Sequence, residues 1–437
     1  MAGIFGFYAF GDERVNWDSS KFIYYGLSAL QGRGQESTSL VIYTHHDNND
    51  PLRWISGEGL VDEVFGKMNQ DYLKGFLGIG QVSAEKKDYA IKVEKPIELA
   101  LVGDGKPALH DNRQKSFQIF AEMLSKKISE LKDPLEATKT LIREVGGGYS
   151  FITLTKDEKM ICGRDIQGIK PLEVGAIGFD IGAVASESSA LDVIGAEQSG
   201  FVKPGETVMF DPLSIEKRHI KNKTAYCSFE YVYLARLDSY LNSISVSNVR
   251  DMIGQRLSEE NPVKAEVVIG VPNTAIPFSM SYSKNSGIPV KYGFTRTGRH
   301  VRSAIKPSQF DRIVGVQLKL NPIRTSVDGK EIILIDDSVV RGNTLRSTVY
   351  NLKRKGAKKV HVRIGSPPLI SRCPFGTEVP PEDELIGKAL SNDEIAEIIG
   401  ADSFAYLSID GLCESIGLPK SSLCLGCFTG KYPERPS

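Results

Sequence analysis

Several features are scarce in this sequence of 437 residues, and each absence narrows what the protein can be. Neither sign of charge is in excess, because Lys and Arg together number 54 and Asp and Glu together also number 54. A chain with balanced charge has no general attraction for nucleic acid or for an anionic membrane. The composition therefore predicts neither kind of partner.

Long apolar runs are also missing. A membrane-spanning helix needs about 20 apolar residues, and no run approaches that length. The short apolar stretch at the N-terminus lacks the basic flank of a secretory signal. We therefore expect a cytoplasmic protein. Six cysteines in so long a chain do not make a disulfide framework. Among six histidines the one adjacent pair is His45-His46, to which we assign no metal.

The length predicts at least two domains, each with its own core. The first half contains short strands, turns and a few helices, whereas the second half alternates strands with helices, including an expected strand at Lys291–Phe294 and a helical part from Glu382 onward. Residues 211–223 are charged and weakly patterned, so we place the boundary there. The predicted domains are residues 1–220 and 221–437. No internal repeat or low-complexity segment is found.

The most informative stretch is 331–346, which reads EIILIDDSVVRGNTLR. Four apolar residues, Ile332 to Ile335, predict a strand buried on both faces. Asp336 and Asp337 follow at its carboxyl end, and a small polar loop leads into a helical pattern and then into a second strand, Val360 to Ile364. This order predicts a βαβ unit with a polar loop where open α/β sheets bind ligands.

The residue types of this loop indicate a chemistry. A helix N-terminus after a turn presents free backbone N–H groups and the positive end of a dipole, which suits a phosphate. Two adjacent carboxylates can accept hydrogen bonds from sugar hydroxyls or hold Mg²⁺. Together these features suggest a phosphoribosyl substrate. On the Asp336-Asp337 pair alone, a magnesium site in some other α/β protein is an equal alternative.

The complete stretch resembles the 5-phosphoribosyl-1-diphosphate (PRPP) signature of type I phosphoribosyltransferases. Further ordered segments resemble the glutamine PRPP amidotransferase family over nearly the whole chain, at residues 30–37, 163–172, 185–197, 227–239, 319–324, 399–412 and 424–433. This resemblance implies a mixed α/β and α+β protein, with an N-terminal Ntn-hydrolase-like αββα sandwich and a C-terminal type I phosphoribosyltransferase α/β domain. It also implies transfer of ammonia to C1 of PRPP, at the start of purine synthesis.

The N-terminal half departs from that family. Its nucleophile is a cysteine at the mature N-terminus, but removing Met1 here would expose Ala2, which cannot attack an amide. The Gly-His-x-Arg-Tyr segment reads Gly80 to Ala84, and the Asn-Gly oxyanion element reads Asp104-Gly105, which puts a carboxylate where negative charge must be stabilised. We therefore expect no glutamine hydrolysis. An unrelated nucleophile such as Ser19 or Thr38 is the competing interpretation.

The resemblance carries over more completely in the C-terminal half. It implies that Asp336 and Asp337 hold ribose hydroxyls or Mg²⁺, and that Thr274, in the loop 271–275, helps to hold the metal. The implied phosphate-binding residues are Ser338, Val340, Arg341, Gly342, Asn343 and Thr344. Residues 296–306 match a flexible loop that closes over PRPP, where Arg296, Arg299, Arg302 and Lys306 would face the pyrophosphate. Basic residues alone would indicate an ordinary surface loop.

Tyr231 and Tyr233 match aromatic residues that line the family's interdomain ammonia path. Core packing is an equal alternative for each tyrosine. Leu237 replaces a proline of the family there, which puts the shape of the path in question.

Four cysteines remain for a metal centre. Cys424 and Cys427 form a C-x-x-C pair, which alone can bind zinc, act in redox chemistry or do neither. By resemblance, these two and Cys227 and Cys373 fall where one branch of the family ligates a [4Fe–4S] cluster. Structural Zn²⁺ is the alternative. The other two, Cys162 and Cys413, stand in apolar surroundings and are expected to be core residues.

The leading hypothesis is a phosphoribosyltransferase that uses PRPP, Mg²⁺ and external ammonia. The ammonia would be free or would come from a glutaminase-competent paralogue in a homo- or hetero-oligomer. The alternative is a non-catalytic regulatory or scaffolding subunit of an active enzyme. A third hypothesis is an altered acceptor, in which another amine or a base attacks PRPP. The intact Asp336-Asp337 loop favours catalysis, whereas the altered 296–306 loop favours the regulatory subunit.

Overall fold

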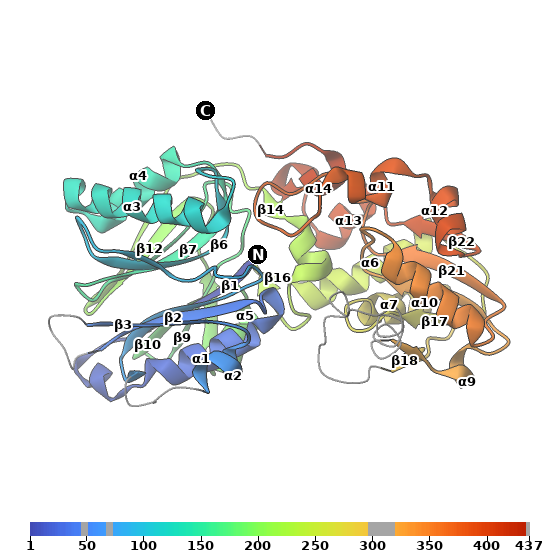
Figure 1. Cartoon of the computed structure of the whole chain (residues 1–437), viewed down its shortest axis with the longest axis horizontal. Coiled ribbons are helices and arrows are strands. Elements are labelled where there is room, and N and C mark those ends of the chain that lie inside the picture. The colour runs from blue at the N-terminus through green and yellow to red at the C-terminus, as the bar shows by residue number, and fades with distance from the viewer. Residues whose placement is uncertain (45–50, 67–72, 296–319, 434–437) are drawn as a thin grey trace.

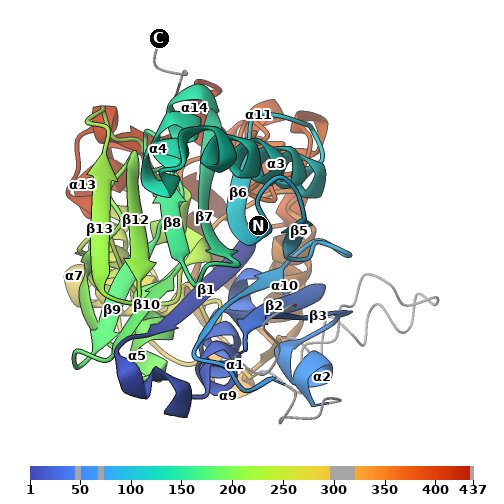
Figure 2. The same ribbon diagram turned by 90° about the vertical axis from the view of Figure 1, so that its left-hand side faces the viewer.

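The computed structural model describes residues 1–44, 51–66, 73–295 and 320–433 (Figures 1 and 2). The N-terminal and C-terminal halves lie side by side, and the N-terminus lies near the junction between them (Figure 1). Among the described residues, none of the helices is both long and apolar enough to cross a membrane.

Two antiparallel sheets stack in the N-terminal half. The first has the strand order β11-β9-β10-β1-β4-β2-β3, and the second has the order β13-β12-β8-β7-β6-β5. Their bounds are β1 Ala2–Ala9, β2 Ser37–Tyr43, β3 Leu52–Glu58, β4 Leu77–Ser83, β5 Ile91–Val93, β6 Leu99–Pro107, β7 Gly147–Thr155, β8 Met160–Arg164, β9 Glu173–Ile177, β10 Ile181–Ala185, β11 Glu197–Phe201, β12 Glu206–Asp211 and β13 Ser214–His219.

Helices cover the outer face of each sheet. The first is covered by α1 (Ser19–Ala29), α2 (Val61–Phe65) and α5 (Ser188–Val193), and the second by α3 (Arg113–Leu131) and α4 (Pro134–Glu144), as Figure 1 shows. The central strand β1 is buried on both faces, because Phe7 stacks on Phe22 of α1 while Tyr8 packs against Phe210 of β12. The result is a four-layer αββα sandwich.

A four-stranded parallel sheet organises the C-terminal half. Its order is β17-β20-β21-β22, with β17 Val267–Gly270, β20 Glu331–Asp336, β21 Lys359–Ile364 and β22 Ser403–Tyr406. One face packs on α6 (Val246–Glu260) and α7 (Ile276–Ser286), and the other packs on α10 (Asn343–Arg354) and α12 (Asn392–Ile399). Ile333 and Ile335 belong to the first core, and Ile332 and Leu334 to the second. The predicted strand buried on both faces is confirmed.

Shorter elements connect these parts and form the tail. They are η1 Asp12–Asn16, η2 Gln31–Arg33, β14 Tyr226–Cys227, η4 Glu230–Leu234, β15 Tyr240–Leu241, β16 Ile244–Ser245, β18 Phe294–Thr295, β19 Asn321–Pro322, α9 Arg324–Val327, η6 Glu382–Glu384, α11 Ile386–Ala389, α13 Ile409–Ile416, η7 Lys420–Ser422, β23 Leu423–Cys424 and α14 Gly426–Thr429. The tail returns to the junction, because β23 pairs in parallel with β14.

Two details differ from the sequence expectations. The strand predicted at Lys291–Phe294 is wrong: the chain makes one bridge at Val290 and then the two-residue strand β18. Lys291 and Tyr292 are exposed, and only Gly293 and Phe294 of this stretch are buried. The charged stretch 211–223 contains β13, an exposed edge strand whose charged side chains suit an unpaired edge.

Candidate active site and cysteine cavity

The two predicted carboxylates lie at the carboxyl edge of the parallel sheet. Asp336 ends β20, and Asp337 follows it. The loop 271–275 follows the neighbouring strand β17 and is joined to β20 by a hydrogen bond from the Val271 N–H to the Ile335 carbonyl, 2.8 Å long. Thr274 lies close enough to the Asp337 carboxylate to act on its pKa, which it lowers. The structure therefore brings together the three residues predicted to hold Mg²⁺.

This carboxylate pair is electrostatically unsatisfied. Burial, followed by the neighbouring charge of Asp337, raises the pKa of Asp336 well above its usual range. Burial also raises the pKa of Asp337 to about 6, although hydrogen bonding from Ser338 and the charge of Arg250 oppose the shift. Among the described residues neither carboxylate forms an ion pair. Both are partly exposed, so a cation or a hydroxyl donor can reach them.

The loop after these carboxylates leads directly into α10. Gly342 has φ +72°, a backbone conformation that favours glycine, and a Cβ at this position would also lie 2.9 Å from the terminal Cδ1 of Ile386. Asn343 and Thr344 form the first turn of α10, whose N–H groups suit a phosphate. Val340 is anchored by a 3.0 Å hydrogen bond from the Ile386 N–H to its carbonyl.

Two other predicted residues of this site, Arg341 and Ser338, contact neighbouring carboxylates, and the predicted basic loop is not described. The guanidinium of Arg341 forms an exposed ion pair with Glu384 of η6. The Ser338 hydroxyl donates to the carboxylate of Asp337 at 2.8 Å. The basic loop residues Arg296, Arg299, Arg302 and Lys306 lie outside the described residues and remain predictions.

A buried ion network occupies the N-terminal centre, where the resemblance places a nucleophile. The guanidinium of Arg33, which is 1% exposed, lies 2.8 Å from Asp104, 2.8 Å from Glu187 and 3.0 Å from Glu230. The ammonium of Lys170 lies 3.2 Å from Glu230. We call these five residues the junction network, because Glu230 belongs to η4 of the C-terminal half and the other four belong to the N-terminal half.

Ala2 is tied to the same network. Its N–H donates to Asp104 Oδ1 at 2.9 Å, and its carbonyl accepts from Arg33 Nε at 3.0 Å. Burial would raise the pKa of Asp104, but the charges of Lys170 and Arg33 outweigh burial and hold that pKa well below its usual range. Asp104 is therefore an ionised, fully paired carboxylate.

The segment Gly80 to Ala84, the counterpart of the Gly-His-x-Arg-Tyr segment in the resemblance, is also hydrogen-bonded within the fold. Gln81 accepts from the Gly103 N–H at 3.1 Å and donates to the Asp88 carbonyl at 3.0 Å. Arg113 and Asp88 form a buried ion pair beside it. The alternative nucleophiles gain no support, because the Thr38 hydroxyl donates to the Gly59 carbonyl at 2.9 Å, and Ser19 is fully buried at the start of α1.

The two tyrosines near the junction have different environments. Tyr231 is fully buried, and its hydroxyl donates to the Leu241 carbonyl and accepts from the Asn242 side-chain amide, both at 3.2 Å. This is the environment of a core residue. Tyr233 is 49% exposed and contacts Phe229. Only Tyr233 is placed to line a path that is open to a solute.

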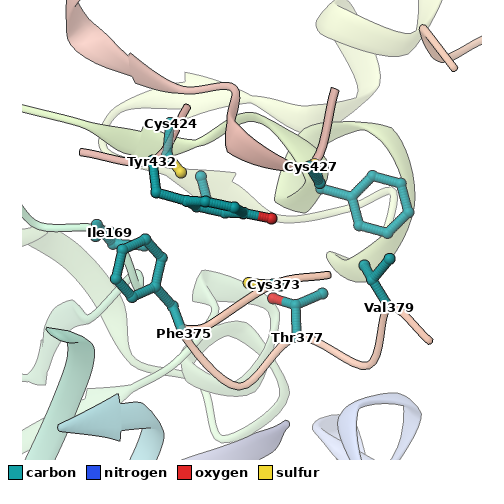
Figure 3. A pocket seen from close by; sticks show the side chains of 10 residues that line it. Ile169, Cys373, Phe375, Thr377, Val379, Cys424, Cys427 and Tyr432 are labelled. Atoms are coloured by element: carbon teal, nitrogen blue, oxygen red, sulfur yellow. The ribbon is translucent and has the colours of Figure 1, made fainter. Parts of the chain in front are cut away.

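The four cysteines predicted to form a metal centre line one cavity at the junction (Figure 3). The pairing of β14 with β23 places Cys227 opposite Cys424. Cys427 follows on α14, and Cys373 comes from the loop that also carries Phe375 and Thr377. All six cysteines of the chain are free thiols, and Cys162 and Cys413 are buried in apolar clusters, which confirms their assignment to the core.

The cavity is unfavourable for free thiolates. Burial raises the pKa of Cys227 to about 12, and burial together with the neighbouring sulfurs raises the pKa of Cys427 as well. Four thiols around one apolar cavity match the all-sulfur donor set of zinc or an iron–sulfur cluster. The raised pKa values of Cys227 and Cys427 do not prevent binding, because a bound metal deprotonates a thiol ligand. As the described side chains stand, no three His, Cys, Asp or Glu residues are grouped as ligands of a metal ion.

Comparison with known proteins agrees with this geometry. The phosphoribosyl transferase domain family matches residues 237–364, which include Asp336 and Asp337. An amidophosphoribosyltransferase of Methanocaldococcus jannaschii is 35% identical over 99% of this chain and 98% of its own length. The chain belongs to the amidophosphoribosyltransferase family. A relative from Staphylococcus aureus is 38% identical over 95% of this chain and 88% of its own length.

Solved amidophosphoribosyltransferase structures share the whole fold. The glutamine PRPP amidotransferase of B. subtilis, solved with ADP and GMP, superposes with a TM-score of 0.87 at 33% identity, over 99% of this chain and 97% of its own. A second structure, described as the allosteric regulatory enzyme of purine biosynthesis, has a TM-score of 0.87 at 32% identity. The predicted pair of folds, an Ntn-type sandwich and a type I phosphoribosyltransferase domain, is confirmed.

Sequence reasoning missed the junction network in this amidophosphoribosyltransferase family member. Arg33, Lys170, Glu187 and Glu230 all stand within segments that carry the family resemblance. Each is a single charge among small or apolar neighbours, which is the signal that could have identified them as buried. Their pairing could not be predicted, because these positions are separated by up to 197 residues in the chain.

Proposed function

We propose that this chain transfers ammonia to C1 of PRPP, releasing pyrophosphate, and that it does not hydrolyse glutamine. The observation that carries the proposal is the pair Asp336-Asp337. The pKa of each carboxyl group is raised, and the pair lies beside Thr274 and the N-terminus of α10. An active centre perturbs titratable groups in this way. Residues 221–437 would form the catalytic domain, and residues 1–220 would form a glutaminase-like domain without glutaminase activity.

The residues present suit a bound substrate. Asp336 and Asp337 would accept hydrogen bonds from ribose hydroxyls, and with Thr274 they offer the oxygen ligands that Mg²⁺ prefers. Bound Mg²⁺ would neutralise the charge that develops on pyrophosphate. The backbone of residues 340–344 would bind the 5′-phosphate. Neutral ammonia needs no general base, so exclusion of water by the 296–306 loop, with Arg296, Arg299 and Arg302, would decide between amination and hydrolysis.

The loss of glutaminase activity follows from what stands at the N-terminal centre. Ala2 carries a methyl group in place of a thiol, and Asp104 presents negative charge where an oxyanion would form. The Asp104 carboxylate is not easily protonated, because Arg33 and Lys170 stabilise its charged form. Ammonia would therefore come from solution or from a glutaminase-competent relative assembled with this chain.

The cysteine cavity is proposed to hold a [4Fe–4S] cluster, with structural Zn²⁺ as the alternative. Cys227, Cys373, Cys424 and Cys427 would be the ligands. The bound group would link the junction segment to the C-terminal tail, as the pairing of β14 with β23 already begins to do. We assign it a structural role.

One experiment tests the catalytic proposal. Pyrophosphate release from PRPP and Mg²⁺ is measured anaerobically with an ammonium salt, with ¹⁵N-amide-labelled glutamine, and with neither. We expect turnover with ammonium alone and no labelled ammonia from glutamine. Robust glutamine hydrolysis would overturn the loss of glutaminase activity. No turnover with ammonium, in protein that retains its metal, would favour the regulatory subunit, and copurification from native cells would then identify its partner.

A further inference from the structure

Lys170 is the member of the junction network that also contacts the lining of the cysteine cavity. Its side chain is fully buried, and its ammonium is 3.2 Å from the Glu230 carboxylate and 3.1 Å from the Thr377 hydroxyl. Thr377 lines the cysteine cavity (Figure 3). One side of the ammonium therefore faces the network and the other faces the cavity.

The segment around Lys170 contacts two of the cysteine-bearing segments. Ile169 lines the cavity, and its carbonyl accepts a 3.2 Å hydrogen bond from the N–H of Cys227. The Lys170 side chain reaches Thr377, four residues beyond Cys373 in the same loop. The chain around Lys170 thus holds one cysteine through its backbone and the loop of another through its side chain.

The cavity itself supplies no compensating charge. The ten described side chains that line it are apolar, aromatic, hydroxyl or thiol groups. Four thiolates around Zn²⁺ carry a net charge of about −2, and four thiolates around an oxidised [4Fe–4S] core carry the same charge. Such a charge is costly in an apolar interior unless a cation is near. Lys170 interacts electrostatically with Cys227 and is the buried cation hydrogen-bonded to the lining.

We propose that Lys170 is the counter-cation and positioning residue of the cysteine site, and that it couples metal occupancy of the site to the ion network joining the two halves. This inference rests on the proposed metal centre. It goes further by assigning a role to a residue that is not a ligand. A positive charge stabilises a more negative cluster, so it raises the reduction potential and slows oxidative loss.

The test uses the full chain, loaded anaerobically with ferrous iron and sulfide in one arm and with Zn²⁺ in the other. Lys170→Gln removes the charge and retains a polar side chain, whereas Lys170→Arg retains the charge. For Lys170→Gln we expect the equilibrium constant for reduction of the cluster to fall about tenfold. For a one-electron couple this is a reduction potential about 59 mV more negative. In the zinc arm we expect about tenfold faster transfer to a chelator. Lys170→Arg should stay near the wild type.

Lys115→Gln, at an exposed position on α3, is the matched control and should change neither quantity. If the wild type binds neither metal, the cysteine site itself is wrong. If the wild type binds metal and Lys170→Gln matches it in potential and in chelator transfer, only the role of Lys170 is overturned.

A second variant decides the case in which Lys170→Gln does not fold, as circular dichroism of the metal-free chain would show. Thr377→Val leaves the ammonium in place and removes its bond to the loop of Cys373. We expect about threefold to tenfold faster metal loss with little change in potential. Metal loss at the wild-type rate would overturn the positioning role.

Discussion

The two halves of the molecule treat buried carboxylates in opposite ways. In the N-terminal half, Asp104 is paired with Arg33, and the charges around it hold its pKa well below the usual range. At the edge of the C-terminal sheet, burial and mutual repulsion raise the pKa values of Asp336 and Asp337. A carboxylate whose partners are built into the fold stabilises structure. A carboxylate pair without an ion-pair partner among the described residues can gain one from a bound cation.

This contrast supports the proposal that the C-terminal centre is active and that the N-terminal centre does not hydrolyse glutamine. Asp104 stays ionised and its charge is compensated by Arg33 and Lys170, so it has no unpaired charge to offer a ligand. The Asp336-Asp337 pair keeps an energetic cost that a bound cation or a hydroxyl donor would relieve. Activity and stability should therefore respond in opposite ways to mutations in the two regions.

The largest expected effect comes from breaking the junction network. Arg33→Met would leave Asp104, Glu187 and Glu230 with far less compensation. Removing one partner of a buried ionic group costs about 3–5 kcal/mol. Urea unfolding should show this loss in the free energy of unfolding. Arg14→Met, which breaks a partly exposed pair with Glu158, is the control and should cost about 1 kcal/mol or less. If Arg33→Met also cost only about 1 kcal/mol or less, the network would not be structural.

The second effect is catalytic. Asp337→Asn should lower the rate of pyrophosphate release with ammonium by about 10²–10³-fold, because a charged group that acts on the reacting substrate is removed. It should not lower the free energy of unfolding. Asp251→Asn, at an exposed position on α6, should change neither quantity. An active Asp337→Asn protein would remove the C-terminal edge from the proposed mechanism.

How far the sequence could predict these two regions depends on the range of the interactions. The C-terminal edge could be predicted, because Ile332–Ile335, the two aspartates and Gly342 lie within a few residues of one another. At the N-terminal centre the sequence shows only departures from the family pattern, as at Ala2 and Asp104. The contacts that these residues make depend on pairing between distant residues, and no local pattern distinguishes a buried Arg33 from an exposed one.

The cysteines show the same limit. Cys424 and Cys427 form a visible motif, but Cys227 and Cys373 could be joined to it only through the family resemblance. The structure brings them together by pairing β14 with β23, two strands of two residues each that no periodicity could indicate. The strand predicted at Lys291–Phe294 is wrong for the opposite reason. There the local residue types suit a strand, but the fold offers no neighbouring strand over most of its length.

The third effect is on pH dependence. The pKa of Asp337 in the folded state, about 6, exceeds the ordinary value of 3.8. Asp337 therefore stays protonated up to a higher pH in the folded state than in the unfolded state. Stability contributed by this group is present below about pH 4 and is lost as pH rises through about 6. Asp337→Asn should therefore be more stable than the wild type at pH 8, by about 1–2 kcal/mol after allowance for partial exposure, and similar to it near pH 4.

The paired carboxylate should show the reverse. Because the folded pKa of Asp104 is depressed, its contribution is present above about pH 4 and is lost as pH falls toward the folded value. Asp104→Asn should therefore be least stable relative to the wild type at pH 6–8. Urea unfolding of both variants at pH 4, 6 and 8 measures the two trends. Parallel trends would remove the distinction between the two regions.

The smallest expected effect lies at the junction between them. Tyr231→Phe removes a hydroxyl bonded to the Leu241 carbonyl and the Asn242 amide, and should cost about 1–2 kcal/mol of unfolding free energy because both partners stay buried. Tyr233→Phe, at a position that is 49% exposed, should cost about 0.5 kcal/mol or less. Ammonium-dependent turnover should be unchanged in both, because each ring is retained. If Tyr233→Phe instead lowered turnover without lowering stability, its hydroxyl would act on the ammonia or on PRPP, and the active centre would extend from the Asp336-Asp337 edge to η4.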